Sequence, residues 1–312
     1  MLDADAKKLL DLIASRNVPS YHTMPAPEAR AFYRDRRFFT QPDASEVAAV
    51  ENFSVPGPAP DVQVPLRSYR PLGSNPQQVL PALVYYHGGG HTIGDLDTHD
   101  VLCRELCNLS GWAVFSVDYR LGPENKFPAA VEDGYAALQW IAGHAEELKI
   151  DPARIAVGGD SAGGNLATVM ALLARDRGGP RLAYQLLIYP ATDLHFNTPS
   201  HETNGQGYLL TREVIDYFTR SYIRSDADRD DWHASPALAP DHSRLPPALV
   251  LTAGYDPLLD EGREYAELLR KAGNEVEYVC YPGQIHGFIT MGRIIAQANE
   301  AVALCANRLK TL

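Results

Sequence analysis

Short apolar runs alternate with longer amphipathic segments along most of the chain. Six runs have the length and composition of buried β-strands and occupy residues 83–86, 113–117, 155–157, 186–189, 249–253 and 276–281. Helical periodicity fills the intervals, over residues 98–110, 128–145, 162–175, 258–272 and 292–310. Because alternating strands and helices build mostly parallel sheets flanked by helices, the pattern predicts an α/β fold.

Three further segments lie outside this alternation. Residues 48–55 and 62–70 are separated by Pro-Gly-Pro and read as an antiparallel hairpin at the sheet edge. Residues 1–40 contain two helix-like segments, and residues 194–235 are too long for one crossover helix. Long insertions at the carboxyl ends of strands usually shape a binding site. We therefore expect a cap over a pocket, within one domain of residues 1–312; the alternative is peripheral helical decoration.

The composition excludes several classes of protein. The chain has 312 residues, 45% of them hydrophobic and 21% charged, which is ordinary for a globular protein. No apolar run reaches the ~18 residues typical of a membrane span, so no stable membrane insertion is expected. The N-terminus lacks the basic start and apolar core of a secretory signal, so we expect a cytoplasmic location. The net charge of −11 argues against nucleic-acid binding.

The cysteines show no metal-binding spacing. Cys103 and Cys107 lie four residues apart in an apolar helical stretch, so we expect them to pack in the core. No second pair completes a zinc site. Disulfides are neither required nor excluded.

A nucleophile motif stands between a predicted strand and a predicted helix. Residues 159–163 match G-x-S-x-G, with Ser161 at its centre. A serine at such a sharp turn is held in a strained conformation at the strand tip, and the helix start supplies amide N–H groups. The rival interpretation, a phosphate-binding loop, lacks the G-x-x-x-x-G-K-[ST] pattern and has no lysine.

A glycine-rich loop follows the strand predicted at residues 83–86. The segment reads His87-Gly88-Gly89-Gly90, which lets several N–H groups point at one oxygen. The alternative is a flexible turn. Because carboxyl ends of neighbouring strands converge, we predict an oxyanion hole from the N–H groups of Gly88, Gly89 and Ala162. His87 precedes the nucleophile, so it is expected to brace the loop rather than act as base.

The chain order of this fold, serine then acid then histidine, selects the remaining partners. Of the five histidines after Ser161, only His286 lies beyond the strand at 249–253, on the loop after the last strand. We predict His286 as the base; a structural loop histidine is the alternative. Asp256 follows the preceding strand and is predicted to orient it. Asp260 falls in the first turn of a helix, where the helix dipole is a sufficient reason for an acid.

Several motifs together give the chain a family resemblance. HGGG, GDSAGGNLA, YRLGPE, FPAAVED, DPLLDEG and the terminal HGF make residues 50–312 resemble the bacterial hormone-sensitive-lipase-like esterases of the α/β-hydrolase fold. The resemblance implies a cofactor-free carboxylesterase of short- to medium-chain acyl esters with an N-terminal helical cap. It also implies that Asp256 belongs to the triad and that a homodimer forms through the strand at 276–281.

This chain departs from the family pattern at three positions. His91 replaces the usual aromatic residue, which predicts a more polar pocket wall, Gly122 replaces alanine, and Leu259 stands where arginine is frequent.

The motifs predict a serine carboxylesterase that acts through an acyl-enzyme and takes a small-molecule ester. An amidase or peptidase on the same scaffold is the first alternative, because a triad serves both acyl groups. A non-catalytic small-molecule receptor is the second; His286 argues against it, because a plant hormone receptor of this fold lacks the triad histidine.

Overall fold

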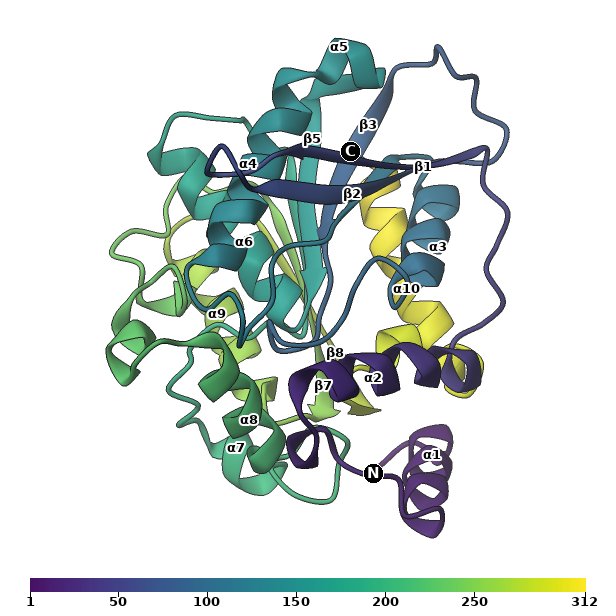
Figure 1. Ribbon diagram of the computed structural model, residues 1–312, viewed down its shortest axis with the longest axis vertical. Coiled ribbons are helices and arrows are strands. Elements are labelled where there is room, and N and C mark those ends of the chain that lie inside the picture. Colours follow the sequence, from purple (N-terminus) through teal and green to yellow (C-terminus); the bar gives the residue numbers. More distant parts are fainter.

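The computed structural model describes all 312 residues and is built around one eight-stranded sheet (Figure 1). The strands are β1 (Ala49–Pro56), β2 (Gln63–Arg70), β3 (Leu80–Tyr86), β4 (Ala113–Val117), β5 (Ile150–Asp160), β6 (Tyr184–Ile188), β7 (Ala248–Tyr255) and β8 (Val276–Ile285). Their spatial order is β1-β2-β4-β3-β5-β6-β7-β8. From β4 to β8 all neighbours are parallel, whereas β1 pairs antiparallel with β2 and β2 with β4. The predicted α/β fold and the edge hairpin are confirmed.

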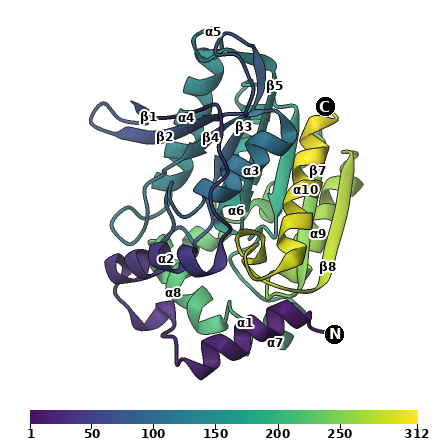
Figure 2. The same cartoon turned by 90° about the vertical axis from the view of Figure 1, so that its right-hand side faces the viewer.

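Helices cover both faces of the sheet (Figures 1 and 2). On one face lie α3 (Asp100–Ser110) and α10 (Ala296–Lys310), and on the other lie α4 (Ala129–Gly143), α6 (Ala162–Asp176) and α9 (Leu259–Lys271). Along β3, Leu83 and Tyr85 pack on the first face and Val84 and Tyr86 on the second. This is the two-residue period of a strand buried on both sides.

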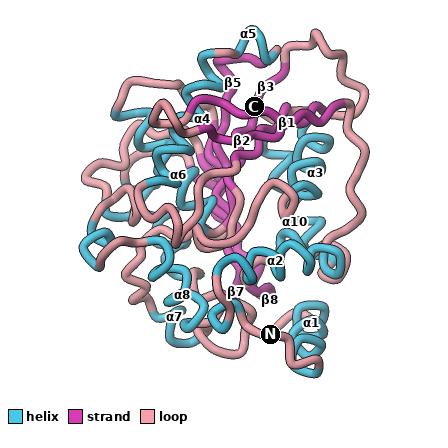
Figure 3. Tube along the Cα trace, viewed as in Figure 1, coloured by secondary structure: helices cyan, strands magenta, loops and turns pink.

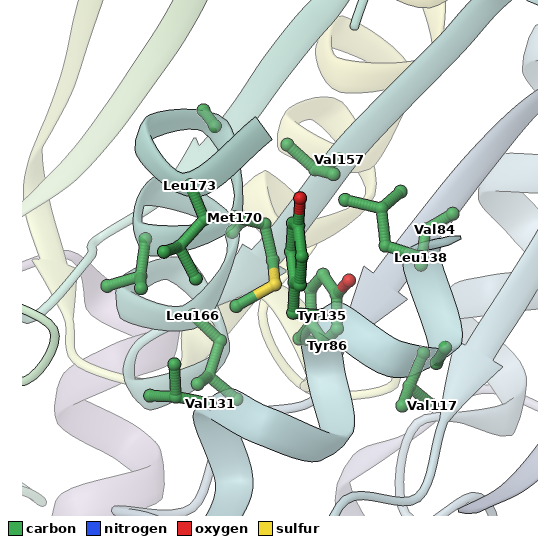
Figure 4. Packing of buried hydrophobic residues seen from close by; sticks show 14 of the residues in the cluster. Val84, Tyr86, Val117, Val131, Tyr135, Leu138, Val157, Leu166, Met170 and Leu173 are labelled. Atoms are coloured by element: carbon green, nitrogen blue, oxygen red, sulfur yellow. The ribbon is translucent and has the colours of Figure 1, made fainter. Parts of the chain in front are cut away.

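The core on the α4–α6 side is dense (Figure 4). Tyr86 and Val157 of the sheet pack with Leu138 of α4 and with Leu166 and Met170 of α6, all fully buried. Burial of side chains this large stabilises the fold by about 1.5–3 kcal/mol each. The strand ends that carry the site are therefore fixed on a rigid support.

The remaining helices gather mainly at one end of the sheet. Figures 1 and 2 both place α1 (Ala4–Ser15), α2 (Ala26–Thr40), α7 (Pro199–Thr203) and α8 (Arg212–Tyr222) beside the carboxyl ends of the parallel strands. The short α5 (Ala145–Leu148) lies at the opposite end (Figure 3). Single 3-10 turns occupy Tyr21–Thr23, Asp226–Asp230, Pro236–Leu238 and Phe288–Thr290. None of the helices has the length and hydrophobicity needed to span a bilayer.

Element boundaries differ from the predicted ones where polar residues enter regular structure. β5 begins at Ile150 rather than at residue 155, because residues 151–154 are polar or exposed and give no strand signal. The last helix begins at Ala296 rather than at residue 292, after a turn. Cys103 and Cys107 are fully buried, as expected for core residues, and all four cysteines are free thiols.

Candidate active site

The predicted nucleophile lies at the turn from β5 into α6. Ser161 has φ 56° and ψ −118°, a conformation that costs a non-glycine residue about 1–3 kcal/mol. Its N–H donates to the carbonyl oxygen of Ile188 on the neighbouring strand, at 2.9 Å. A Cβ on Gly163 would fall inside van der Waals contact with the carbonyl of Tyr86. The glycine motif thus permits the close approach that holds the serine at the strand tip.

The structure brings the three predicted triad residues into one hydrogen-bonded chain. His286 Nε2 lies 2.9 Å from Ser161 Oγ, and His286 Nδ1 lies 2.7 Å from Asp256 Oδ2. Asp256 is completely buried, and its Oδ1 accepts the N–H of Leu258 at 2.8 Å. With Nδ1–H donated to the carboxylate, Nε2 is free to accept the serine proton.

The other four histidines after Ser161 are committed elsewhere. His195 contacts Asp193 and Asp230, His201 contacts Glu261, His233 contacts Asp231, and His242 contacts the carbonyl oxygen of Pro236. The ring of Tyr189 packs against His286 with centroids 4.7 Å apart. Sequence reasoning missed Tyr189, whose position directly after β6 was the available signal.

The prediction that the Gly88 amide belongs to the oxyanion hole is wrong. Its N–H donates to Asp160 Oδ1 at 3.0 Å, so it points away from the pocket. Gly89, Gly90 and Ala162 line the pocket together with Ser161. The N–H groups of Gly89 and Gly90 have no acceptor within the protein, and that of Ala162 is free as the first residue of a helix.

Asp160 anchors the glycine loop, a role that sequence reasoning missed. Its Oδ1 also accepts the Tyr85 hydroxyl at 2.9 Å and lies 3.1 Å from His99 Nε2. Burial opposes ionisation of this carboxyl, but His99 and the Tyr85 hydroxyl outweigh it and hold the pKa of Asp160 below its usual value. The residue before Ser161 is therefore a buried carboxylate with three donors.

His87 braces the glycine loop from behind, as predicted. Its Nδ1 lies 2.8 Å from the carbonyl oxygen of Gly88, and its ring stacks on Tyr119 with centroids 4.3 Å apart. Desolvation by burial lowers the pKa of His87 well below its ordinary value, so the ring is neutral.

His91 lines the pocket but behaves as a flat neutral ring. It stacks on Tyr222 with centroids 3.8 Å apart, and burial lowers its pKa to about 3. The absence of Cβ at Gly122 also has a reason here, because a methyl group there would collide with the carbonyl of Ser221.

Residues 1–40 and residues 194–235, the two long stretches outside the strand–helix alternation, both line the pocket. The earlier one contributes Tyr21, Tyr33, Arg36, Arg37 and Thr40, and the later one contributes Leu194, Phe196, Leu209, Leu210, Val214, Ile215, Phe218, Thr219 and Tyr222. The helix α1 contributes no lining residue; Ala6 and Leu9 pack in the core cluster on the α3–α10 face. The cavity is therefore mainly apolar, and Ser161 and His286 both line it. No group of three His, Cys, Asp or Glu side chains is arranged to hold a metal ion.

Comparison with other proteins gives consistent matches. A family model described as alpha/beta hydrolase fold matches residues 83–290. The chain is 48% identical over 264 residues to the carboxylic ester hydrolase LipN of Mycobacterium tuberculosis, covering 81% of this chain and 69% of LipN. It is 37% identical over 316 residues to the ethyl acetate hydrolase of Pseudomonas putida, covering 99% and 98%.

This chain is similar to solved structures over nearly the whole length of both chains. The ester hydrolase EH1AB1 from the metagenome of Lake Arreo has a TM-score of 0.95 and 44% identity, covering 100% of this chain and 99% of that chain. The esterase of Pyrobaculum calidifontis has a TM-score of 0.91 and 41% identity, with the same coverage.

Proposed function

This chain belongs to the alpha/beta hydrolase fold family, among its bacterial hormone-sensitive-lipase-like carboxylesterases, and we propose that it hydrolyses carboxylic esters through Ser161, His286 and Asp256. The observation that carries this assignment is the hydrogen-bonded chain from Ser161 Oγ through His286 to the buried Asp256 carboxylate. An unbroken chain of this kind is what nucleophilic acyl transfer requires.

In the acylation step, Ser161 Oγ attacks the ester carbonyl carbon while His286 Nε2 accepts the hydroxyl proton. Asp256 keeps the imidazole in the right tautomer and stabilises the imidazolium that forms. Collapse of the tetrahedral intermediate breaks the bond to the alcohol oxygen, to which His286 returns the proton. The alcohol leaves, and the acyl group stays on Ser161.

Deacylation repeats the sequence with water as nucleophile. His286 Nε2 takes a proton from water, the hydroxide attacks the acyl carbon, and the proton passes to Ser161 Oγ as the carboxylic acid leaves. We propose that the N–H groups of Gly89, Gly90 and Ala162 bind the oxyanion in both halves of the reaction. A single such donor is typically worth 10²–10³ in kcat.

The substrate range follows from the walls of the pocket. We propose that residues 1–40 and 194–235 form the cap, and that the apolar side chains of the later stretch favour short- to medium-chain acyl groups.

The outer edge of β8 is unpaired in the monomer and supports the expected homodimer. The reaction as written needs no cofactor.

The test compares Ser161→Ala with Ser221→Ala, whose hydroxyl lies off the pocket and bonds to the carbonyl of Tyr217. On 4-nitrophenyl acetate and butanoate, Ser161→Ala should lose nearly all activity, with only ~10³–10⁴ over water remaining. Ser221→Ala should stay near normal. A Ser161→Ala variant with a tenth of the activity would remove Ser161 from the mechanism.

Two further measurements separate the alternatives. Hydrolysis of the matching anilide at a rate similar to that of the ester would favour the amidase alternative. Failure of a fluorophosphonate to label Ser161 would favour the receptor.

A further inference from the structure

The helix α2 has one face turned toward the pocket, and that face is cationic. Tyr33, Arg36, Arg37 and Thr40 all line the cavity. Their spacing of three, four and seven residues is that of one side of an α-helix. An apolar pocket would be expected to meet the apolar face of such a helix, yet two guanidinium groups stand there.

These two arginines are the unpaired ones of the helix. Arg30 pairs with Glu124 at 2.6 Å and Arg34 with Asp95 at 2.5 Å, and neither lines the cavity. Arg36 donates only to the Tyr21 hydroxyl at 2.7 Å, and Arg37 only to the carbonyl oxygen of Arg34 at 2.7 Å. Each guanidinium has five N–H donors, so most of them have no protein acceptor.

The carboxylates nearby do not neutralise the pair. Asp160 is the only acid that lines the cavity, and it is occupied by Tyr85, Gly88 and His99. In the adjoining groove that Arg37 also lines, Asp43 pairs with Arg293, and both Asp97 and Asp100 pair with Arg67. On α2 itself, Asp35 directly precedes Arg36, and adjacent helical positions do not face each other.

Aromatic contacts hold both guanidinium groups in place. The centre of the Arg36 guanidinium lies 5.6 Å from the Tyr21 ring centroid and 5.9 Å from that of Phe32, and Arg37 lies 4.3 Å from the ring of Phe38. Stacking of this kind leaves the edge of a guanidinium, where its N–H groups are, available to a planar anion. The protein as a whole has a net charge of −11, yet two unpaired guanidinium groups line the cavity. Such groups favour binding of a ligand with a negative charge.

We propose that Arg36 and Arg37 form a subsite for an anionic group of the substrate, so that the preferred esters carry a carboxylate away from the scissile bond. The inference rests on the proposed ester hydrolysis and specifies its substrate class. A guanidinium matches a carboxylate in a bidentate arrangement, and that contact can form without disturbing the groups around Ser161.

The experiment uses two matched pairs of esters. In the first pair the charge is on the acyl side, in mono-4-nitrophenyl adipate and its neutral methyl ester. In the second it is on the alcohol side, in 4-acetoxybenzoate and its methyl ester. For each pair the measured quantity is the ratio of kcat/KM for the anionic ester to that for the neutral one.

Four variants are compared with the unmodified protein. Arg36→Gln and Arg37→Gln should each lower the ratio of at least one pair about two- to fivefold, the range of an exposed ion pair, because hydrolysis of the anionic ester falls more than that of the neutral one. Arg36→Lys, which keeps the charge, should retain most of the ratio. Arg220→Gln is the control, because Arg220 is an exposed, unpaired arginine of α8 off the pocket. Added salt should lower the ratio of the unmodified protein toward that of the glutamine variants.

Equal ratios in the unmodified protein and both glutamine variants, for both pairs, would overturn the subsite while leaving ester hydrolysis intact. Loss of neutral-ester hydrolysis in the unmodified protein would instead contradict the proposed function. If one glutamine variant fails to fold, the other glutamine variant and the salt dependence decide the matter, because a ratio that added salt leaves unchanged would also overturn the subsite.

Discussion

At the scale of single residues, two aspartates four positions apart make different contacts. Asp256 Oδ2 accepts His286 Nδ1, whereas Asp260 accepts the N–H of Ser200 at 2.8 Å and pairs with Arg263 at 2.8 Å. Asp260 therefore connects α9 to α7 and does not reach the imidazole. We predict that Asp256→Asn lowers kcat by roughly 10³–10⁴, by analogy with a protease in which the amide fixes the wrong tautomer.

For Asp260→Asn the expected loss is below about tenfold, because the amide oxygen still accepts the Ser200 N–H. The measurement is kcat of both amides on one aryl ester, with circular dichroism to verify folding. If Asp256→Asn is nearly normal and Asp260→Asn has lost most of its activity, Asp260 rather than Asp256 orients His286.

Asp160 is expected to act through the glycine loop. An asparagine can accept the Gly88 N–H but carries no charge for His99, so the loop is held less firmly. We predict that Asp160→Asn lowers kcat about ten- to a hundredfold with little change in KM, below the 10²–10³ typical of losing an oxyanion donor outright. Tyr85→Phe, which removes only one donor to Asp160, should cost less.

A structural role alone would lower stability and leave the turnover of the folded fraction unchanged. The informative readout is therefore kcat per labelled active site, titrated with a fluorophosphonate, together with KM. If kcat per site is unchanged in Asp160→Asn, the carboxylate does not position the loop.

The site residues that could be predicted from the sequence differ in one physical respect from the site groups that could not. Ser161, Asp256 and His286 follow from chain order and from their places after strands. Which N–H groups of His87-Gly88-Gly89-Gly90 face the pocket does not follow from chain order. It depends on Asp160, which accepts the Gly88 N–H and lies 72 residues away in the chain. A motif gives the loop its freedom, and a distant side chain decides which N–H groups face the pocket.

At the scale of elements, α8 closes one wall of the pocket against the glycine loop. The ring of Phe218 lies so close to Gly90 that a Cβ there would overlap it, and it also contacts Tyr21. We predict that Phe218→Ala enlarges the pocket at this wall and shifts the preferred acyl chain to a longer one. The ratio of kcat/KM for 4-nitrophenyl octanoate to that for 4-nitrophenyl acetate should rise roughly tenfold. A buried methylene is worth about 0.8 kcal/mol and a tenfold change corresponds to about 1.4 kcal/mol, so burial of about two more methylenes of the longer chain is enough.

Tyr217→Ala is the matched control, because Tyr217 directly precedes Phe218 in α8 and does not line the pocket. An identical chain-length profile in the two variants would mean that α8 does not select the acyl group.

The elements themselves were largely predictable, since strands buried on both faces carry continuous apolar runs. The polar start of β5 was not, because β3 pairs with Ile150 and then with Ile155, and the four residues between them form an irregularity that no apolar run marks. The two stretches of residues 1–40 and 194–235 could be placed outside the alternation, but their position at the pocket depends on contacts between distant parts of the chain.

At the scale of the whole molecule, the carboxyl ends of five strands meet at one edge. His87, Ser161, Tyr189, Asp256 and His286 each follow directly on a strand of the sheet. Buried polar contacts then fasten the later pocket-lining stretch to this edge. Glu261 of α9 accepts His201 Nε2 of α7 at 2.9 Å and the N–H of Thr192 at 2.7 Å.

Glu261 gives this connection a pH dependence. Desolvation by burial outweighs the hydrogen bonds from His201 and Thr192 and raises the pKa of Glu261 to about 7, from an ordinary value of 4.5. Between these two values the folded protein holds a proton that the unfolded chain has released. The contribution of Glu261 to stability is therefore fully present below pH 4.5 and is lost as pH rises through 7, at up to about 1.4 kcal/mol per pH unit.

We therefore predict that Glu261→Gln flattens the fall in stability across this range. The amide oxygen keeps the Thr192 N–H, and the neutral imidazole of His201 can accept from the amide NH2, so shape and bonding persist without the titration. The measurement is the free energy of unfolding in urea at pH 5, 6, 7 and 8 for both proteins, with the difference between them plotted against pH. That difference should favour Glu261→Gln increasingly up to about pH 7 and then level off. Because other titrating groups change stability equally in both proteins, a constant difference over the whole range would show that Glu261 is ionised throughout and that its burial is fully compensated by His201.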